Sequence, residues 1–257
     1  MRNVYVLAIA QALSAAGMMT VFLLGGILGS QFAPLPQLAT LPVSLTVVGL
    51  AATAIPAALL MERIGRRTAF VINPSGDLIA TYRKIHMFDV ELAGGESYRE
   101  SATVASGDEI VVTEIDGIVV GLATCYDLRF PELFRILALR GAEAIVLPAA
   151  FTMTTGKDHW ETLIRARAIE NQIYMIASAQ WGLHPPGAWC YGRSMIVDPW
   201  GTVIATAADG VGVATAIIQP SRVEAVRRQV PSLANRRPEA YRWPEEAASF
   251  AAGRLAV

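Results

Sequence analysis

The chain has 257 residues and a formal net charge of −1, which gives no reason to expect a nucleic-acid partner. Its two cysteines, Cys125 and Cys190, form no CxxC motif and its three histidines are scattered, which argues against a disulfide framework and a zinc site. Hydrophobic residues make up 53% of the chain and the mean hydropathy is +0.41, with the excess in a charge-free stretch between Arg2 and Glu62.

Two apolar runs fill this first part of the chain, from residue 4 to about 29 and from about 41 to 61. Each is long enough to cross a hydrocarbon core, and residues 30–37 between them have the prolines and polar groups of a turn. Arg2 precedes the first run and three arginines follow the second, so the positive-inside rule places both ends in the cytoplasm. The pattern predicts a two-helix transmembrane hairpin. A cleavable signal peptide is the alternative for about the first 30 residues.

The second apolar run ends in Met-Glu-Arg-Ile-Gly-Arg-Arg at residues 61–67. This ending resembles the loop after the second helix of major facilitator transporters, and residues 1–67 as a whole resemble the first two spans of that family. Such transporters build their pathway from about a dozen helices in two halves, so two spans cannot carry a substrate by themselves. Transport is therefore the least favoured function for the whole chain.

After residue 67 the pattern changes to short apolar runs separated by turns. Residues 69–72 and 78–82 predict a β-hairpin, because the turn residues 73–77 separate them. Helices are predicted at Pro131–Arg140 and Lys157–Asn171, where apolar residues recur at helical spacing. Further strands are predicted at residues 109–114, 118–123, 144–147, 174–179, 194–197 and 211–218. Strands that alternate with helices and show little polar alternation indicate an α/β domain whose sheet is buried on both sides.

Cys125 lies between the predicted strand at 118–123 and the helix that Pro131 can begin. A strand-to-helix turn aims the sulfur out of the sheet and brings it near the N–H groups of the helix start. Such groups favour a thiolate and can bind an oxyanion, whereas a lone cysteine elsewhere is usually a small buried apolar residue. Its position therefore makes Cys125 the candidate nucleophile.

Four blocks in this part of the chain carry a strong resemblance to a known superfamily. They are Tyr-Arg-Lys-Ile-His-Met-Phe-Asp at 82–89, Cys-Tyr-Asp-Leu-Arg-Phe-Pro-Glu at 125–132, Arg-Ala-Arg-Ala-Ile-Glu-Asn at 165–171 and Gly-Arg-Ser-Met-Ile-Val-Asp-Pro-Trp-Gly at 192–201. With them, residues from about 68 to 243 resemble the nitrilase, or carbon–nitrogen hydrolase, superfamily, and most of all its small-amide and ω-amidase branch. The resemblance implies an α-β-β-α sandwich, a nitrilase-like α/β fold. Because the hairpin stands where the N-terminal part of that sandwich should be, the predicted domains are 1–67 and a truncated hydrolase domain, 68–257.

In that superfamily a cysteine nucleophile works with a lysine and two glutamates. Residue by residue, the resemblance implies Cys125 as the nucleophile, Lys84 as the lysine and Glu100 as the second glutamate, with Glu91 as the alternative to Glu100. A nearby ammonium stabilises a thiolate and a charged tetrahedral intermediate, and a carboxylate can hold that lysine or relay a proton. The backbone N–H after Cys125 would join Lys84 in binding the oxyanion.

The residues that surround the nucleophile in sequence, or follow the end of a predicted strand, are candidates for binding substrate: Tyr126, Arg129, Phe151 and Thr152. For Arg129 the competing expectation is an ion pair with Glu132 that braces the turn. For Phe151 and Thr152 it is core packing. Cys190 is expected to be a structural residue.

The first glutamate of the superfamily, its general base, has no counterpart before Lys84. Glu62 is the one carboxylate before Asp77, and it lies among three arginines at a predicted helix end, where an interfacial ion pair explains it better. A missing general base costs about 10²–10⁴-fold in rate.

Three functions are consistent with these observations. The first is a carbon–nitrogen hydrolase of the amidase or nitrilase class, which cleaves a small amide or nitrile through a thioester at Cys125 and releases ammonia without a cofactor or metal. The second is a catalytically impaired, membrane-anchored fusion product, and the third is a transporter fragment. The expected partners are a small-molecule substrate, the cytoplasmic membrane through residues 4–61 and, by resemblance, a second copy of the chain. The hydrolase domain would face the cytoplasm, and the protein would be cytoplasmic if the hairpin does not insert.

Overall fold

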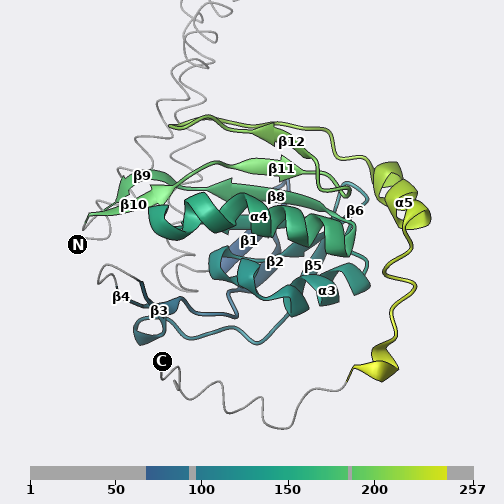
Figure 1. The fold of residues 1–257 in the computed structure, drawn as a ribbon, viewed down its shortest axis with the longest axis horizontal. Coiled ribbons are helices and arrows are strands. Elements are labelled where there is room, and N and C mark those ends of the chain that lie inside the picture. The colour runs from purple at the N-terminus through teal and green to yellow at the C-terminus, as the bar shows by residue number, and fades with distance from the viewer. Residues whose placement is uncertain (1–67, 93–96, 185–186, 242–257) are drawn as a thin grey trace, which may run out of the picture.

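The structure is a computed structural model that describes residues 68–92, 97–184 and 187–241. Its centre is a six-stranded sheet in the order β12-β11-β8-β7-β6-β5 (Figure 1). The three middle strands are parallel: β6 (Ile118–Leu122), β7 (Ala144–Ala149) and β8 (Tyr174–Ala179). The outer strands extend the sheet in antiparallel fashion: β5 (Val112–Ile115), β11 (Met195–Val197) and β12 (Val203–Thr206).

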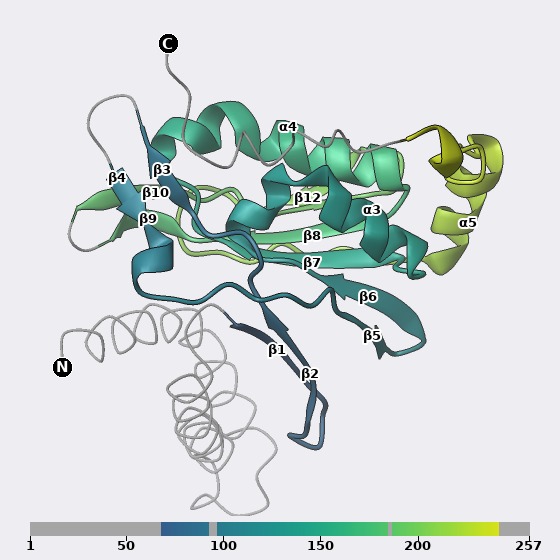
Figure 2. The same ribbon diagram turned by 90° about the horizontal axis from the view of Figure 1, so that it is seen from below.

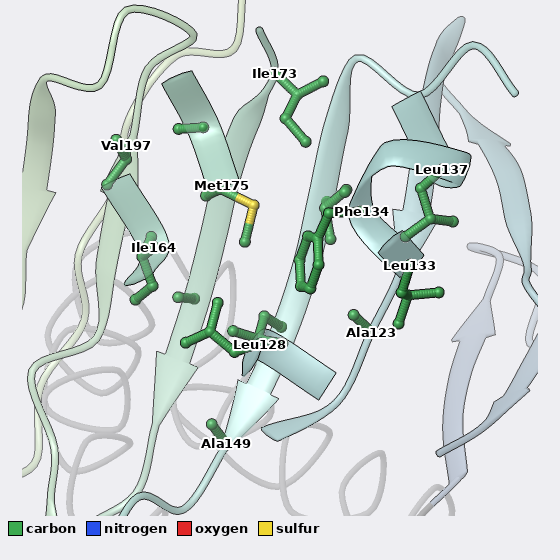
Figure 3. Close-up of a cluster of buried hydrophobic side chains, with 14 of the residues drawn as sticks. Ala123, Leu128, Leu133, Phe134, Leu137, Ala149, Ile164, Ile173, Met175 and Val197 are labelled. Atoms are coloured by element: carbon green, nitrogen blue, oxygen red, sulfur yellow. The ribbon is translucent and has the colours of Figure 1, made fainter. Parts of the chain in front are cut away.

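The crossovers between the parallel strands are helical, and both helices cover the same face of the sheet (Figure 2). They are α3 (Pro131–Leu139) and α4 (Met153–Asn171). Pro131 suits the first turn of α3 because its missing N–H has no helical partner there, and Gly141, with a φ of 95°, turns the chain after the helix ends. The main hydrophobic core lies between these helices and the sheet, where Phe134 of α3 and Ile164 of α4 are completely buried (Figure 3).

The opposite face of the sheet carries a hairpin formed by β1 (Thr68–Ile72) and β2 (Leu78–Arg83). Tyr82 of this hairpin is completely buried in a second cluster with Val120 and Leu122 of β6. Of the four predicted layers, the described residues therefore show one helical layer, the six-stranded sheet and a two-stranded piece on the other face (Figure 2).

Shorter elements complete the described part of the chain. β3 (Asp89–Glu91) pairs with β4 (Ser97–Arg99), and β9 (Trp181–His184) pairs with β10 (Ala188–Tyr191). Three short 3₁₀ helices are present among the described residues: η2 (Glu100–Ala102) after β4, η3 (Cys125–Arg129) after β6, and η4 (Pro238–Ala240). The last α-helix, α5 (Pro220–Gln229), packs Val223 against residues of β7 and β8. β10 is tied to the end of β7, because the Tyr191 N–H donates to the Phe151 carbonyl at 2.9 Å.

Most of the strands and helices predicted after residue 67 are present. The β1–β2 hairpin is confirmed, and the predicted strand at 174–179 coincides with β8. Both predicted helices are confirmed, although α4 begins four residues earlier, at Met153, because Thr152 caps it. The prediction of a strand at 211–218 is wrong: this segment pairs with no strand of the described residues, and Val213 and Ile217 are 87% and 78% exposed. An apolar run alone does not make a strand when no neighbouring strand accepts its hydrogen bonds.

The predicted transmembrane hairpin lies outside the described residues. Among the helices of residues 68–92, 97–184 and 187–241, none is long and apolar enough to cross a bilayer. The α/β fold of this part excludes the interpretation of the whole chain as a transporter fragment.

Candidate active site

The Cys125 turn follows the end of β6. Thr124 is extended, with a φ of −140°, whereas Cys125 adopts a left-handed conformation with a φ of 52°. That conformation costs a non-glycine residue about 1–2 kcal/mol, so the surrounding contacts must hold it. The half-buried thiol lies 4.0 Å from the Ala150 carbonyl oxygen at the end of β7. Cys125 begins the single turn η3 and precedes α3 by six residues, so the expected position at the start of the long helix is corrected: only η3 supplies the neighbouring N–H groups.

A buried ion pair lies beside this turn. The Lys84 ammonium is 2.6 Å from Oε2 of Glu100, and each side chain is only 2% exposed. The Phe88 N–H donates to the same carboxylate oxygen at 2.6 Å. Of the two glutamates considered for this position, Glu100 contacts Lys84, whereas Glu91 lies exposed in β3. A buried charge is stable only when it is paired and hydrogen-bonded, so the three groups depend on one another.

One pocket brings the predicted catalytic residues together. Lys84, Glu100 and Cys125 all line it, and its other walls come from the ends of β7 and β8 and from the β9–β10 hairpin. A smaller hollow next to Cys125 is lined by all four predicted substrate-binding residues, Tyr126, Arg129, Phe151 and Thr152. Cys125 therefore lines both the pocket that contains the buried cation and the hollow with aromatic walls.

Arg129 does not brace the turn in the predicted way. Among the ion pairs of the described residues none joins it to Glu132, whose side chain is exposed. Both terminal nitrogens of Arg129 lie 3.3 Å from Nδ1 of His159, and the guanidinium carbon lies 5.4 Å from the centre of the Phe151 ring. The guanidinium thus borders the hollow beside His159 of α4 and makes no ion pair with Glu132. A cation in that position can attract an anionic group.

Phe151 and Thr152 have structural roles as well as positions in the pocket wall. Phe151 is 5% exposed and packs on Trp160, with ring centres 4.9 Å apart. The Thr152 hydroxyl accepts a hydrogen bond from the Thr155 N–H at 3.3 Å and so caps α4. Phe151 and Thr152 therefore line the hollow, as expected of substrate-binding residues, and also pack in the protein interior, as the competing expectation held.

Cys190 of β10 also lines the larger pocket and is 8% exposed. Burial, and to a smaller extent the charge of Cys125, raise the pKa of the Cys190 thiol. A thiol with a raised pKa is a poor nucleophile at neutral pH, which agrees with the expectation of a structural role.

Sequence reasoning missed Asp127, which is completely buried two residues after Cys125. Its carboxylate accepts hydrogen bonds from Tyr82, His86 and the Thr124 backbone. Burial and the Asp127 charge raise the pKa of Tyr82 far above its usual value, so its hydroxyl stays a donor. The available signal was an aspartate within an apolar stretch, since such a residue needs donors from other segments.

Among the described residues that line the larger pocket, Glu100 is the one acidic side chain. Glu62, the weak candidate for a replacement base, lies outside the described part of the chain. Within that part, no group of three histidine, cysteine, aspartate or glutamate side chains is placed to hold a metal ion.

The fold and the site define a class of protein: an α/β domain in which a cysteine at a left-handed turn lies near a buried lysine–glutamate pair. A sequence model of the carbon–nitrogen hydrolase family matches residues 10–228. The chain belongs to the carbon–nitrogen hydrolase family, and the predicted superfamily is confirmed.

Similar proteins agree with this assignment. The chain is 48% identical to a deaminated glutathione amidase of Synechocystis sp. over 171 residues, which are 66% of this chain and 63% of the relative. The solved structure of the Caenorhabditis elegans NitFhit protein has a TM-score of 0.65 and 43% identity, covering 68% of this chain and 43% of that one. Saccharomyces cerevisiae Nit3, of branch 10 of the nitrilase superfamily, has a TM-score of 0.58 and 34% identity over 64% and 57% of the two chains. The chain thus spans less than two thirds of the length of these relatives.

The family match begins at residue 10 and so overlaps most of the segment assigned to a transporter-like hairpin. The comparisons give that assignment no support. The domain boundary at residue 67 and the two membrane spans stay predictions.

Proposed function

We propose that the protein is a thiol-dependent amidase that hydrolyses a small amide through a thioester at Cys125. The observation that carries this proposal is the convergence on one pocket of a strained, half-buried cysteine and a Lys84–Glu100 ion pair whose side chains are 2% exposed. A buried cation beside a thiol favours the thiolate, and strain at the turn keeps the sulfur presented to the pocket.

In the proposed reaction the Cys125 thiolate attacks the amide carbonyl carbon, and the carbonyl oxygen becomes an oxyanion. Lys84 and the Tyr126 backbone N–H stabilise that oxyanion. When the oxyanion collapses, the C–N bond breaks, and the nitrogen takes up the proton that the Cys125 thiol lost, so that it leaves as ammonia. Water then attacks the thioester, the C–S bond breaks, and a carboxylic acid and the free thiol are formed.

The substrate side of the site supports an amide that also carries a carboxylate. Arg129 borders the hollow next to Cys125 and contacts His159 and two aromatic rings, Tyr126 and Phe151. Arginine binds carboxylates well because its planar group offers two parallel donors. The Synechocystis relative is named for deaminated glutathione, a substrate that we extend to this chain as the first compound to test.

Kinetics on the full chain test this proposal. We expect release of one carboxylic acid and one ammonia per amide, abolished in Cys125→Ala. Arg129→Gln should raise KM for amides that carry a carboxylate and leave KM for neutral amides unchanged. Asp209→Asn, which alters an exposed ion pair with Arg193, is the matched control. Hydrolysis that persists in Cys125→Ala would overturn the proposal.

An impaired hydrolase stays a second proposal, because the sequence before Lys84 has no counterpart of the general-base glutamate that the resemblance implies. Without a general base, turnover should be lower than in a complete family member by about 10²–10⁴-fold. Turnover at an ordinary enzymatic rate would reject the impaired form of the proposal and leave the amidase itself standing.

We also propose, from the sequence alone, that residues 4–61 form a membrane hairpin and that the chain forms a homodimer. If residues 4–61 insert in the membrane, the full chain should sediment with the membrane fraction and be released by detergent, not by salt or carbonate. Size-exclusion chromatography with light scattering tests the dimer. Recovery in the supernatant would reject the hairpin, and a monomer mass would reject the dimer.

A further inference from the structure

We propose that Asp127 is a positioning residue that locks the segment carrying Lys84 to the turn carrying Cys125. This inference rests on the proposed function and deepens it, because neither the family blocks nor the expected roles of the residues assign a task to this carboxylate. Asp127 does not line either pocket around Cys125, so it acts through its neighbours.

The carboxylate of Asp127 is saturated by four donors, three from the distant segment 82–86 and one from its own turn. Its Oδ2 accepts from the Tyr82 hydroxyl at 2.7 Å and from the Thr124 N–H at 2.9 Å. Its Oδ1 accepts from the His86 N–H at 3.1 Å and, with the proton on Nδ1, from the His86 ring at 2.8 Å. Two carboxylate oxygens offer about four acceptor sites, so every site is used.

These donors frame the two reactive residues. Tyr82 and His86 stand two positions before and two positions after Lys84, and Thr124 stands directly before Cys125. The His86 ring also stacks on Phe130 at the end of η3, with ring centres 3.6 Å apart. A movement of the Lys84 segment relative to the cysteine turn would therefore break bonds on both oxygens of one carboxylate.

The same carboxylate holds the strained conformation of Cys125. Asp127 is tied back to the turn twice, because its backbone N–H also donates to the Thr124 carbonyl at 3.1 Å. A left-handed cysteine persists only when the surrounding structure fixes it. The contacts of Thr124 with Asp127 supply that constraint on the residue that precedes Cys125.

An asparagine amide at position 127 cannot accept all four of these hydrogen bonds. Asparagine has the shape of aspartate but accepts hydrogen bonds at one oxygen only, and its amide group is a donor. In Asp127→Asn two of the four donors would face another donor. The turn should then relax and the ammonium of Lys84 should move away from the thiol.

The chain offers a matched control in Asp198, which is 7% exposed and lies between β11 and β12. Its carboxylate also accepts several hydrogen bonds, from the N–H groups of Trp200 and Thr202 at 3.0 and 2.9 Å and from Arg222 at 3.0 Å. It touches neither Lys84 nor the cysteine turn. Asp198→Asn therefore repeats the same chemical change at a buried carboxylate away from the site.

The test is the pH profile of Cys125 alkylation by iodoacetamide in the full chain, followed on the Cys125 peptide by mass spectrometry. In Asp127→Asn the rate of alkylation at pH 7 should fall by about tenfold or more, because the relaxed turn no longer holds the thiol in the pocket that Lys84 lines. For a good substrate kcat should fall by about 10²-fold with little change in KM, as for a displacement of about 1 Å. Asp198→Asn should keep the wild-type profile at a comparable loss of thermal stability.

If Asp127→Asn does not fold, Tyr82→Phe takes its place, because it removes one donor and keeps the ring. It should lower the rate of alkylation at pH 7 by a smaller amount. A folded Asp127→Asn, or failing that Tyr82→Phe, with the wild-type alkylation profile would overturn the proposal. Since alkylation needs no turnover, a wild-type protein that hydrolyses no amide would reject the proposed function and leave this comparison valid.

Discussion

The site around Cys125 has two walls that are built in different ways. The charged wall consists of Lys84, Glu100 and Cys125, with Asp127 behind the pocket surface, and is held by buried charges and one strained residue. The packed wall consists of Phe151, Thr152 and Cys190, with Gly156 and Tyr191 behind the pocket surface, and is held by a helix cap, backbone hydrogen bonds and close contacts. A charged group that is buried away from water is stable only with a paired or hydrogen-bonded partner, so the residues of the charged wall depend on one another. The packed wall is stabilised by side-chain packing and backbone hydrogen bonds and needs no such pairing.

The largest expected effect is on the charged wall. Lys84→Met removes the lysine partner of the buried Glu100 carboxylate, and breaking a buried pair from one side typically costs about 3–5 kcal/mol. Urea unfolding of the full chain measures the change. The matched control is Arg228→Met, which breaks an exposed pair with Glu224 at 3.5 Å and should change stability little. Equal effects of the two substitutions would show that burial does not make the Lys84–Glu100 pair more costly to break than an exposed pair.

The next effect is on the packed wall. A Cβ added to Gly156 of α4 would clash with the Cβ of Tyr191, so Gly156→Ala should force β10 away from the helix. Overpacking of this kind costs about 1–3 kcal/mol. Thermal unfolding measures it, and Gly212→Ala, where an added Cβ meets nothing within 4 Å, is the control. A Gly156→Ala protein as stable as the control would mean that the two elements are loosely packed.

The cap of α4 gives a smaller effect. Thr152→Ala removes the hydroxyl that accepts from the Thr155 N–H, which should cost about 1 kcal/mol. Thr152→Ser keeps the acceptor and should keep the stability. A loss of the same size in both variants would place the contribution of Thr152 in its methyl group and not in the cap.

The smallest effect tests the strain at the nucleophile. At a φ of 52°, glycine avoids a cost of about 1–2 kcal/mol but loses about 0.5–1 kcal/mol of chain entropy relative to alanine. Cys125→Gly should thus be more stable than Cys125→Ala by about 0.5–1 kcal/mol. At Ala150, which is not among the described residues with a positive φ, glycine should be less stable than alanine. The same order at both positions would show that Cys125 is not strained.

The sequence could predict the parts of the site that depend on short, continuous blocks. Lys84 and Cys125 lie in the blocks 82–89 and 125–132, Glu100 was implied by the same resemblance, and the structure places all three around one pocket. The contact that decided between Glu100 and Glu91 was not predictable, because it depends on how η2 folds back on Lys84. Asp127 was missed for the same reason, since its partners Tyr82 and His86 lie 45 and 41 residues away.

In the fold, too, the elements that could not be predicted are those that depend on a partner elsewhere in the chain. β7 and β8 were predictable because a strand buried on both faces is apolar throughout. The segment 211–218 has the same composition but no partner strand among the described residues, and composition does not show whether a partner exists. α5 was missed because it buries only Val223 and Val226 among polar residues, which is a weak periodic signal.

The central claim, that Cys125 forms a thioester, can be tested by rapid quenching of the full chain with a small amide, followed by mass spectrometry. Transfer of the acyl group to Cys125 must precede release of the acid, so quenching within the first turnover traps the intermediate. We predict a mass increase equal to the acyl group on the Cys125 peptide, none on Cys190, and none in Cys125→Ala. Amide hydrolysis with no acyl group on Cys125, or with one on Cys190, would contradict the account.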